Sequence, residues 1–251
     1  MQQSGRADVR TKVANLKPEF DELFFDLLEQ LRTEELSTDT YQQLMVEACS
    51  RPDLVDALSD AMERVDRAGQ AEWLVRRHVG SRRYTIQVYK LMPDASQAPH
   101  QHHNLISTHL VLRGKIHLRE YQRIATDDAD NLVLEPARDG VLTAGQMFQA
   151  SEWCNNVHWF GAVDGPALMF SIDARGYETS TFHQEKPEAD GDAEGFGRRY
   201  LDPTIYDANG YTIGVNLPED VAKHRFEDRP LSDFPAPAHA SDTRRTYRKS
   251  A

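Results

Sequence analysis

The stretch APHQHHNLISTHLVLRG, residues 98–114, contains four of the chain's ten histidines. Along an extended strand the side chains alternate between two faces, and residues two apart are separated by about 6.5–7 Å. His100 and His102 therefore point the same way and are close enough to bind one metal ion, whereas His103 points to the opposite face. Imidazole binds iron, copper, nickel and zinc alike. The pair therefore predicts a metal site without naming the metal.

A third imidazole has to come from another strand. His158 lies in the β-like run NVHWFGAV, after a turn-forming AGQMF segment, and we expect it to join His100 and His102. His109 lies two residues after Ser107 and should share the face that points into a barrel. From the sequence it can be a fourth ligand, a general base, a donor that orients a ligand, or a hydrogen-bonded core residue.

These histidines lie within a β-rich region that starts after Gly69. Short apolar runs are separated by Gly, Pro, Asp or Asn turns without a helical pattern between them, which predicts an antiparallel barrel or sandwich. We expect strands over residues 72–79, 83–91, 106–114, 115–121, 131–136, 141–145, 156–163 and 166–173, and a further strand over 211–217. Several of these runs are apolar on both faces, so the outer face also needs a cover.

The N-terminal part is predicted to supply that cover. Apolar residues at three- and four-residue spacing over 17–31 predict an amphipathic helix, and residues 37–49 indicate a second one. Ser50 with Asp53, and Pro52 in the first turn, predict a third helix through LVDALSDAMERV. The helices need a surface to pack on and the sheet needs a cover, so we expect one domain.

The expected organisation has four segments. They are a flexible N-terminus (1–14), helices covering the barrel (15–69), the β-barrel with the metal site (70–217) and a largely disordered C-terminal tail (218–251). Within the third segment, the charged and glycine-bearing residues 183–199 are predicted to form a loop. The predicted fold class is mainly β, with the N-terminal helical segment packed on the barrel.

Composition narrows the classes of function. The chain carries 29 basic and 40 acidic residues, a net charge of −11, and no basic stripe, which argues against nucleic acid as a partner. No apolar run reaches the roughly 18 residues needed to cross a bilayer. Cys49 and Cys154 are too few and too far apart for a disulfide framework. We therefore expect a reduced, cytoplasmic protein with no membrane partner.

The histidine region resembles the first motif of the cupin superfamily, and that resemblance implies a double-stranded β-helix (jelly-roll) barrel. His100, His102 and Gly114 stand in register with the motif, and Ser107 occupies the position of its usual glutamate. The second cupin motif is matched more loosely, by a leading glycine and by His158 with extra residues between them.

The resemblance covers about residues 72–175. Cupins that lack the glutamate but keep three histidines resemble the thiol dioxygenases, the family of cysteine dioxygenase. By that resemblance the three histidines would hold Fe(II), with Zn, Ni or Cu left open by the ligand type. Ser171 matches a serine of that family's relay, while Asp173 and Arg175 replace the histidine and tyrosine that follow it. The catalytic candidates are therefore His109, Ser171 and Asp173.

Substrate binding needs counter-charges. Arg76 and Arg77 lie where the resemblance implies a carboxylate-binding arginine, and adjacent strand residues face opposite sides, so at most one of them points inward. The other candidates for substrate binding are Arg175, beside the acidic Asp173, and Tyr89 as a wall of the cavity.

Together these features predict a three-histidine, non-heme Fe(II) dioxygenase that adds O2 to a small polar, thiol- or amino-acid-like substrate. Two alternatives stay open. One is a non-oxidative metallo-cupin, an isomerase or lyase that uses the metal as a Lewis acid. The other is a non-catalytic cupin that senses a ligand. A homodimer is expected only by analogy with other cupins.

Overall fold

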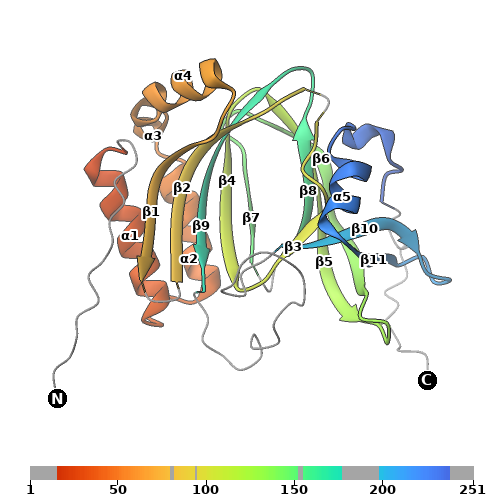
Figure 1. Cartoon of the computed structure of the whole chain (residues 1–251). Helices are drawn as coiled ribbons and strands as arrows, with labels where there is room; N and C mark the ends of the chain where they lie inside the picture. Colours follow the sequence, from red (N-terminus) through yellow and green to blue (C-terminus); the bar gives the residue numbers. More distant parts are fainter. Residues whose placement is uncertain (1–15, 80–81, 94, 152–154, 177–197, 238–251) are drawn as a thin grey trace.

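The computed structural model describes residues 16–79, 82–93, 95–151, 155–176 and 198–237. In these residues the strands form two sheets, and helices cover one of them (Figure 1). The first sheet has the order β1-β2-β9-β4-β7. Its strands are β1 (Glu72–Val79), β2 (Arg82–Leu91), β4 (Leu105–Arg113), β7 (Met147–Ala150) and β9 (Ala167–Arg175).

The second sheet closes on itself in the order β10-β11-β6-β5-β8-β3. Its strands are β3 (His100–His102), β5 (Lys115–Thr126), β6 (Leu132–Thr143), β8 (Val157–Ala162), β10 (Arg198–Tyr206) and β11 (Thr212–Leu217). The strand pairs are antiparallel, and the chain passes repeatedly from one sheet to the other between β2 and β9. The prediction of a mainly β barrel with N-terminal helices packed on it is confirmed.

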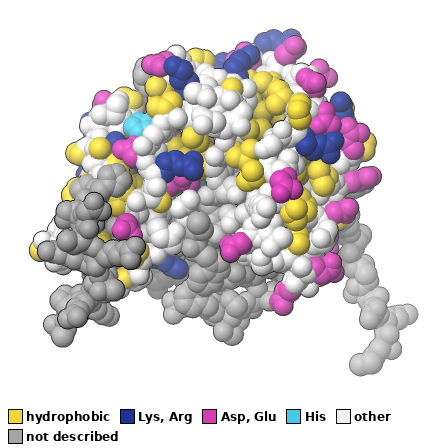
Figure 2. All heavy atoms as spheres, turned by 180° about the vertical axis from the view of Figure 1, so that it is seen from behind, with side chains coloured by type: hydrophobic (Ala, Val, Ile, Leu, Met, Phe, Trp, Pro, Cys, Tyr) yellow, Lys and Arg dark blue, Asp and Glu magenta, His cyan; other side chains and the backbone are white. Residues whose placement is uncertain are grey.

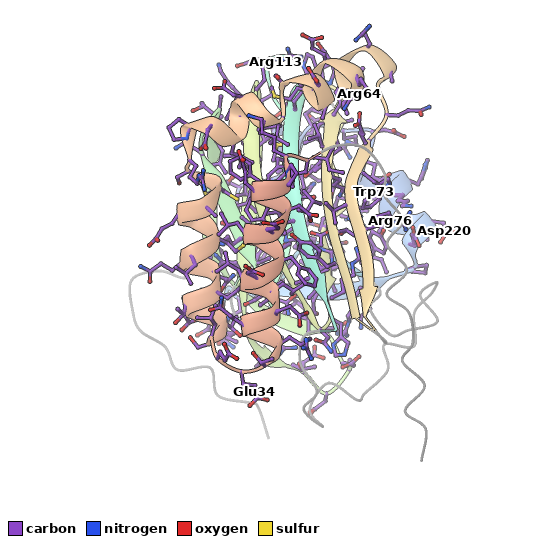
Figure 3. All side chains as sticks on the ribbon, turned by 90° about the vertical axis from the view of Figure 1, so that its left-hand side faces the viewer. Glu34, Arg64, Trp73, Arg76, Arg113 and Asp220 are labelled. Carbon is purple, nitrogen blue, oxygen red and sulfur yellow. The ribbon has the colours of Figure 1, made fainter. Side chains whose placement is uncertain are left out.

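The N-terminal helices lie against the outer face of the first sheet (Figures 1 and 3). They are α1 (Pro18–Arg32), α2 (Thr38–Cys49), α3 (Pro52–Ala57) and α4 (Ser59–Ala68). The third expected helix is divided in two at Leu58, which is buried. Ser37 begins α2 as its N-cap, where its hydroxyl accepts the backbone N–H of Thr40 at 3.2 Å.

Strand β4 shows how one strand serves two cores. Ile106, Leu110 and Leu112 pack in the same apolar core as Phe24 of α1. Val111 points to the other side and packs in a second apolar cluster with residues of the second sheet. Each fully buried large apolar side chain contributes about 1.5–3 kcal/mol relative to an exposed position. Burial on both faces therefore explains why this run is apolar without strict alternation.

The C-terminal part corrects one expectation. Residues 218–237 are packed on the barrel rather than disordered, with helix α5 (Glu219–Phe226) and the 3-10 turn η2 (Leu231–Asp233). Phe226 and Phe234 pack edge-on against Trp159, at ring distances of 5.1 and 4.6 Å. Arg119, itself buried, donates to the backbone oxygens of Phe234 and of the following proline. The remaining tail and residues 1–14 lie outside the described residues.

Two strand predictions also differ from the structure. Residues 132–143 form one continuous strand instead of two, and the pairing with β5 continues past Pro136. The register shifts there, because Glu120 pairs with Arg138 and Tyr121 pairs with Pro136, so β6 carries the extra residue of a β-bulge. Strand β10 was missed, and its first two residues, Arg198 and Arg199, lay in the predicted loop. The other residues of that loop, 183–197, lie outside the described part of the chain. The predicted strand over 211–217 corresponds to β11.

The surface of the molecule carries mixed charges. Acidic, basic and apolar side chains are interspersed on the face shown in Figure 2. None of the helices in the described residues is long and apolar enough to cross a membrane.

Candidate metal centre

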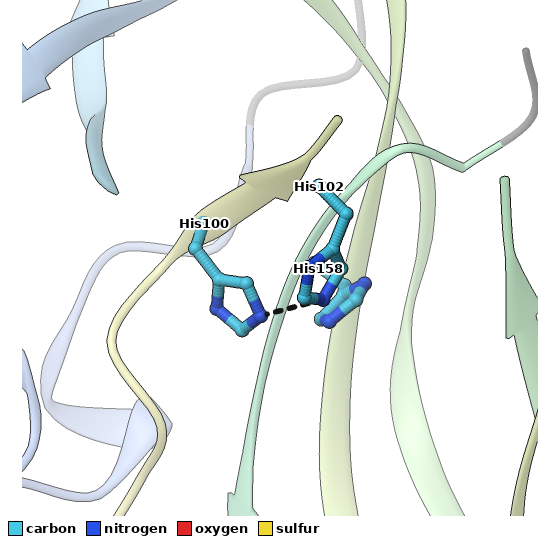
Figure 4. Close-up of side chains that lie close together, drawn as sticks. All are labelled: His100, His102 and His158. Atoms are coloured by element: carbon cyan, nitrogen blue, oxygen red, sulfur yellow. Dashed lines mark hydrogen bonds between the residues drawn. The ribbon is translucent and has the colours of Figure 1, made fainter. Parts of the chain in front are cut away.

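Three imidazoles converge inside the barrel (Figure 4). His100 and His102 come from β3, and His158 comes from the neighbouring strand β8, where it lies directly opposite His100 in the register. The ring of His100 lies 4.6 Å from that of His102 and 4.5 Å from that of His158. One potential ligand atom from each residue lies within 4.8 Å of the other two, and all three residues are buried. The predicted convergence of these three side chains is therefore present.

The donor atoms fit a divalent metal ion. The Nε2 atoms of His100 and His102 are 3.1 Å apart. Metal–imidazole bonds are about 2.0–2.1 Å long, so two ligands at angles of roughly 90–110° have nitrogens about 2.9–3.4 Å apart. Within the described residues the cluster consists of imidazoles alone. The arrangement is therefore a possible three-histidine metal site.

The three histidines are neutral, as metal ligands must be. Burial lowers the pKa of each of them well below 6.5, and neighbouring positive charges, such as that of Arg198, lower the pKa of each further. His100 Nδ1 lies 2.7 Å from the backbone oxygen of Ala98, so Nδ1 carries the proton and donates it. That hydrogen bond leaves the lone pair of His100 Nε2 free for a metal.

His109 lies beside the cluster rather than in it. Its ring stacks on Phe148 at 4.5 Å and lies 6.0 Å from the ring of His158. Its Nδ1 shares a hydrogen bond of 3.2 Å with the Tyr89 hydroxyl, while Nε2 is buried without a hydrogen-bond partner in the described residues. Burial lowers the pKa of His109 to about 4. This geometry suits a group that holds or passes a proton more than a fourth ligand.

The other polar candidates follow the same face of the first sheet. Ser171 lies opposite His109 in the register and accepts a hydrogen bond from Gln87 at 3.1 Å. Asp173 lies opposite Ser107, and the Ser107 hydroxyl is buried without a hydrogen-bond partner in the described residues. Asp173 and Arg175 form a long ion pair, with oxygen and nitrogen 4.0 Å apart.

Two arginines of β1, Arg76 and Arg77, are the other candidates for substrate binding. Arg76 stacks on Trp73, 4.9 Å from the ring centre, at the edge strand of the first sheet (Figure 3). The side chain of Arg77 lies outside what the structure describes. The predicted role of either residue in substrate binding stays a prediction.

Glu120 was not identified from the sequence. It lies on β5 directly opposite His158, is only 1% exposed, and has its carboxylate 3.2 Å from Arg138 Nε. Burial raises the pKa of Glu120 to about 7. The signal that could have found it is the alternation in KIHLREY, where Glu120 follows Ile116 and Leu118 on one face.

No protein-family model matches the sequence, and no curated protein matches it. Solved structures with partial likeness include the 11S globulin of Wrightia tinctoria, 20% identical with a TM-score of 0.30 over 37% of this chain and 20% of that chain. A cupin superfamily protein of Desulfitobacterium hafniense is 14% identical, with a TM-score of 0.27 over 41% of this chain and 75% of that chain. The Cnp3 cupin domain of Schizosaccharomyces pombe is 10% identical, with a TM-score of 0.30 over 42% and 61%.

The chain spans about a fifth of the length of the globulin. At these TM-scores the likeness carries no argument about a metal, a ligand or a reaction. The three-histidine cluster is known from the chain's own geometry.

Proposed function

We propose that this protein is a metal-dependent oxygenase in which His100, His102 and His158 hold Fe(II) and a small polar molecule is oxidised by O2. One observation carries the proposal: three neutral, buried imidazoles converge, and no carboxylate is part of their cluster in the described residues. Three neutral ligands leave a divalent metal with its full charge of +2. Such a centre favours anionic substrates such as a thiolate, an enolate or a catecholate.

Iron held at such a site would supply a place where substrate and O2 bind side by side. The chain's own contribution begins with His109 and Tyr89. Burial raises the pKa of Tyr89, so its hydroxyl keeps its proton and can donate it to His109 Nδ1. Neutral His109 then carries its own proton on Nε2, the atom without a partner among the described residues. That proton is available to a bound reactant.

Substrate orientation falls to the polar side chains of β9. Asp173 and Arg175 carry opposite charges on one face, with 4.0 Å between their charged atoms. A substrate with both an amine and a carboxylate can pair with both, and the Ser107 hydroxyl and Ser171 add neutral hydrogen-bonding groups on that face. This pattern supports an amino-acid-like substrate, including one that carries a thiol.

The test is an oxygen-uptake screen of iron-reconstituted protein against small thiols and amino acids, with metal content measured on the same samples. We expect stoichiometric iron and O2 consumption that depends on one of these substrates. Stoichiometric zinc or nickel, with turnover in the absence of O2, would replace the oxygenase by an isomerase or lyase. Ligand binding by metal-free protein, unaffected by chelators, would replace it by a ligand sensor.

A further inference from the structure

The interior face of strand β5 carries an acidic residue next to the metal cluster. Ile116 and Leu118 of this strand belong to the apolar cluster between the sheets, and Glu120 continues the same alternation. In the register, Glu120 lies directly opposite His158 on β8 and directly opposite Arg138 on β6. Side chains at directly opposed positions share a face, with Cβ atoms about 4.5–5.5 Å apart. Glu120 is therefore an immediate neighbour of one of the three histidines.

Both members of this pair have buried polar atoms without hydrogen bonds. Nδ1 of His158 and both carboxylate oxygens of Glu120 lack a hydrogen-bond partner within the described residues. Arg138 Nε lies 3.2 Å from the carboxylate and forms an ion pair with it. The geometry of this contact is not that of a hydrogen bond, so both carboxylate oxygens stay without one. A buried polar group without a partner costs about 1–3 kcal/mol, so such atoms in a native protein need an explanation.

Metal binding supplies an explanation. A neutral imidazole that binds a metal through one nitrogen carries a proton on the other, and that N–H is usually donated to a carboxylate, a backbone oxygen or water. His100 already follows this rule through the backbone oxygen of Ala98. The neighbour of His102 in the register of β10 is Arg198, which offers donors only. Glu120 is the one acidic neighbour that the register gives to these histidines within the described strands.

We propose that Glu120 is the positioning residue of His158: its carboxylate accepts the Nδ1–H of His158 when the ring binds a metal, and Arg138 holds the carboxylate in place. The inference rests on the proposed metal centre. Glu120 is not among the residues whose ligand atoms converge, so it acts through His158 rather than on the metal directly. It also brings one negative charge beside a centre whose ligands are all neutral. The chain would thus recover, from another strand, the acidic group that Ser107 lacks.

The test compares Zn²⁺ binding by chelator competition in the wild type, Glu120→Met and Glu120→Gln. Methionine keeps the size but removes the acceptor, so we expect a loss of Zn²⁺ affinity of about 10–100-fold. Glutamine keeps a neutral acceptor and should lose less. Glu135→Gln, on the exposed part of β6, is the matched control and should leave the affinity unchanged.

A second readout separates positioning from a merely structural role. In the Zn²⁺-loaded wild type, the ring N–H of His158 should give a slowly exchanging proton resonance far downfield, as expected for donation to a carboxylate. Glu120→Gln, which preserves shape and should fold, shifts that resonance upfield. Unchanged affinity and an unchanged resonance in both Glu120 variants would overturn the inference while leaving the metal centre standing. Failure of the wild type to bind metal would overturn the proposed function together with it.

Discussion

The two ends of the barrel interior are built from the same strands but have opposite character. At one end, Val111 pairs with Met169 and Leu118 pairs with Phe160, and all four are buried in one apolar cluster. At the other end, two residues away on each of these strands, the inward-facing side chains are polar. His109 then pairs with Ser171, and Glu120 pairs with His158. The change from apolar to polar therefore occurs at the same level on β4, β5, β8 and β9.

The apolar end and the polar end therefore contribute differently to the stability of the fold and to the candidate metal site. The apolar end and the helix-covered face supply the burial that stabilises the fold. The polar end contains buried atoms without hydrogen bonds in the described residues, including Ser107 Oγ and Nδ1 of His102 and His158. Each such atom lowers the stability of the metal-free protein. A ligand that satisfies several of them at once should therefore stabilise the folded state.

The largest expected effect concerns the histidines of the polar end. His102→Ala or His158→Ala should remove most of the bound metal, by more than the roughly 10–100-fold expected for the loss of a residue that only supports a ligand. The fold should survive, because the apolar end is untouched. Metal analysis after reconstitution and far-UV circular dichroism measure the two effects. Normal metal content in both variants would contradict the assignment.

A substitution at the apolar end should have the reverse effect. Leu118→Ala removes a fully buried side chain, so we expect the free energy of unfolding of the chelated protein to fall by about 2–5 kcal/mol. Zn²⁺ affinity, measured on the folded variant, should change little. The control is Val141→Ala, half exposed on β6, which should stay within about 0.5 kcal/mol. A larger effect on metal affinity than on unfolding would mean that the two ends are not separable.

Acid should destabilise the metal-free protein through its polar end. Burial lowers the pKa of the three cluster histidines well below 6.5 and that of His109 to about 4. Below about pH 6.5 the unfolded chain therefore binds protons that the folded state does not, and the free energy of unfolding falls by up to about 1.4 kcal/mol per pH unit for each histidine. Urea unfolding at pH 7.5 and pH 5.5 with chelator present measures this.

Glu120 has the opposite effect on the free energy of unfolding as the pH falls. Its pKa is raised to about 7, so between pH 7 and its ordinary value of 4.5 the folded state binds a proton that the unfolded chain lacks. Stability from this residue therefore grows as the pH falls. Because four histidines act against one glutamate, the net change on acidification should be a loss, and it should be steeper in Glu120→Gln. Stability that does not change between the two pH values would argue against buried neutral histidines.

The smallest expected effect concerns Arg175, next to the acidic Asp173. Arg175→Ala should raise the KM of the oxygen-uptake reaction roughly 2–10-fold, the value of a hydrogen bond of about 0.5–1.5 kcal/mol. Metal content should stay at the wild-type level, because Arg175 is not one of the converging ligands. An unchanged KM would exclude Arg175 from substrate binding.

Much of the candidate site was predictable because local patterns determine which face a side chain occupies. The spacing of His100 and His102 put both rings on one face, and the helical stripe of residues 17–31 predicted α1. The prediction of disorder fails for residues 218–237, because a short proline-rich segment shows no periodicity in its sequence. Its order comes from contacts with Trp159 and Arg119, far away in the sequence.

The sequence by itself determined which side of each strand a residue occupies, and therefore which side chains point into the barrel. It also determined that amphipathic helices would cover the outer surface of the barrel. Only the tertiary structure decided the register between strands, that is, which inward-facing residues of different strands lie opposite one another. His158 lies opposite His100 and Glu120 because of strand pairing, and two bulges, one on β6 and one on β5, shift the register between those two strands. Alternation repeats every two residues along a strand and carries no information about the register of its neighbour, so these partners could be found only in three dimensions.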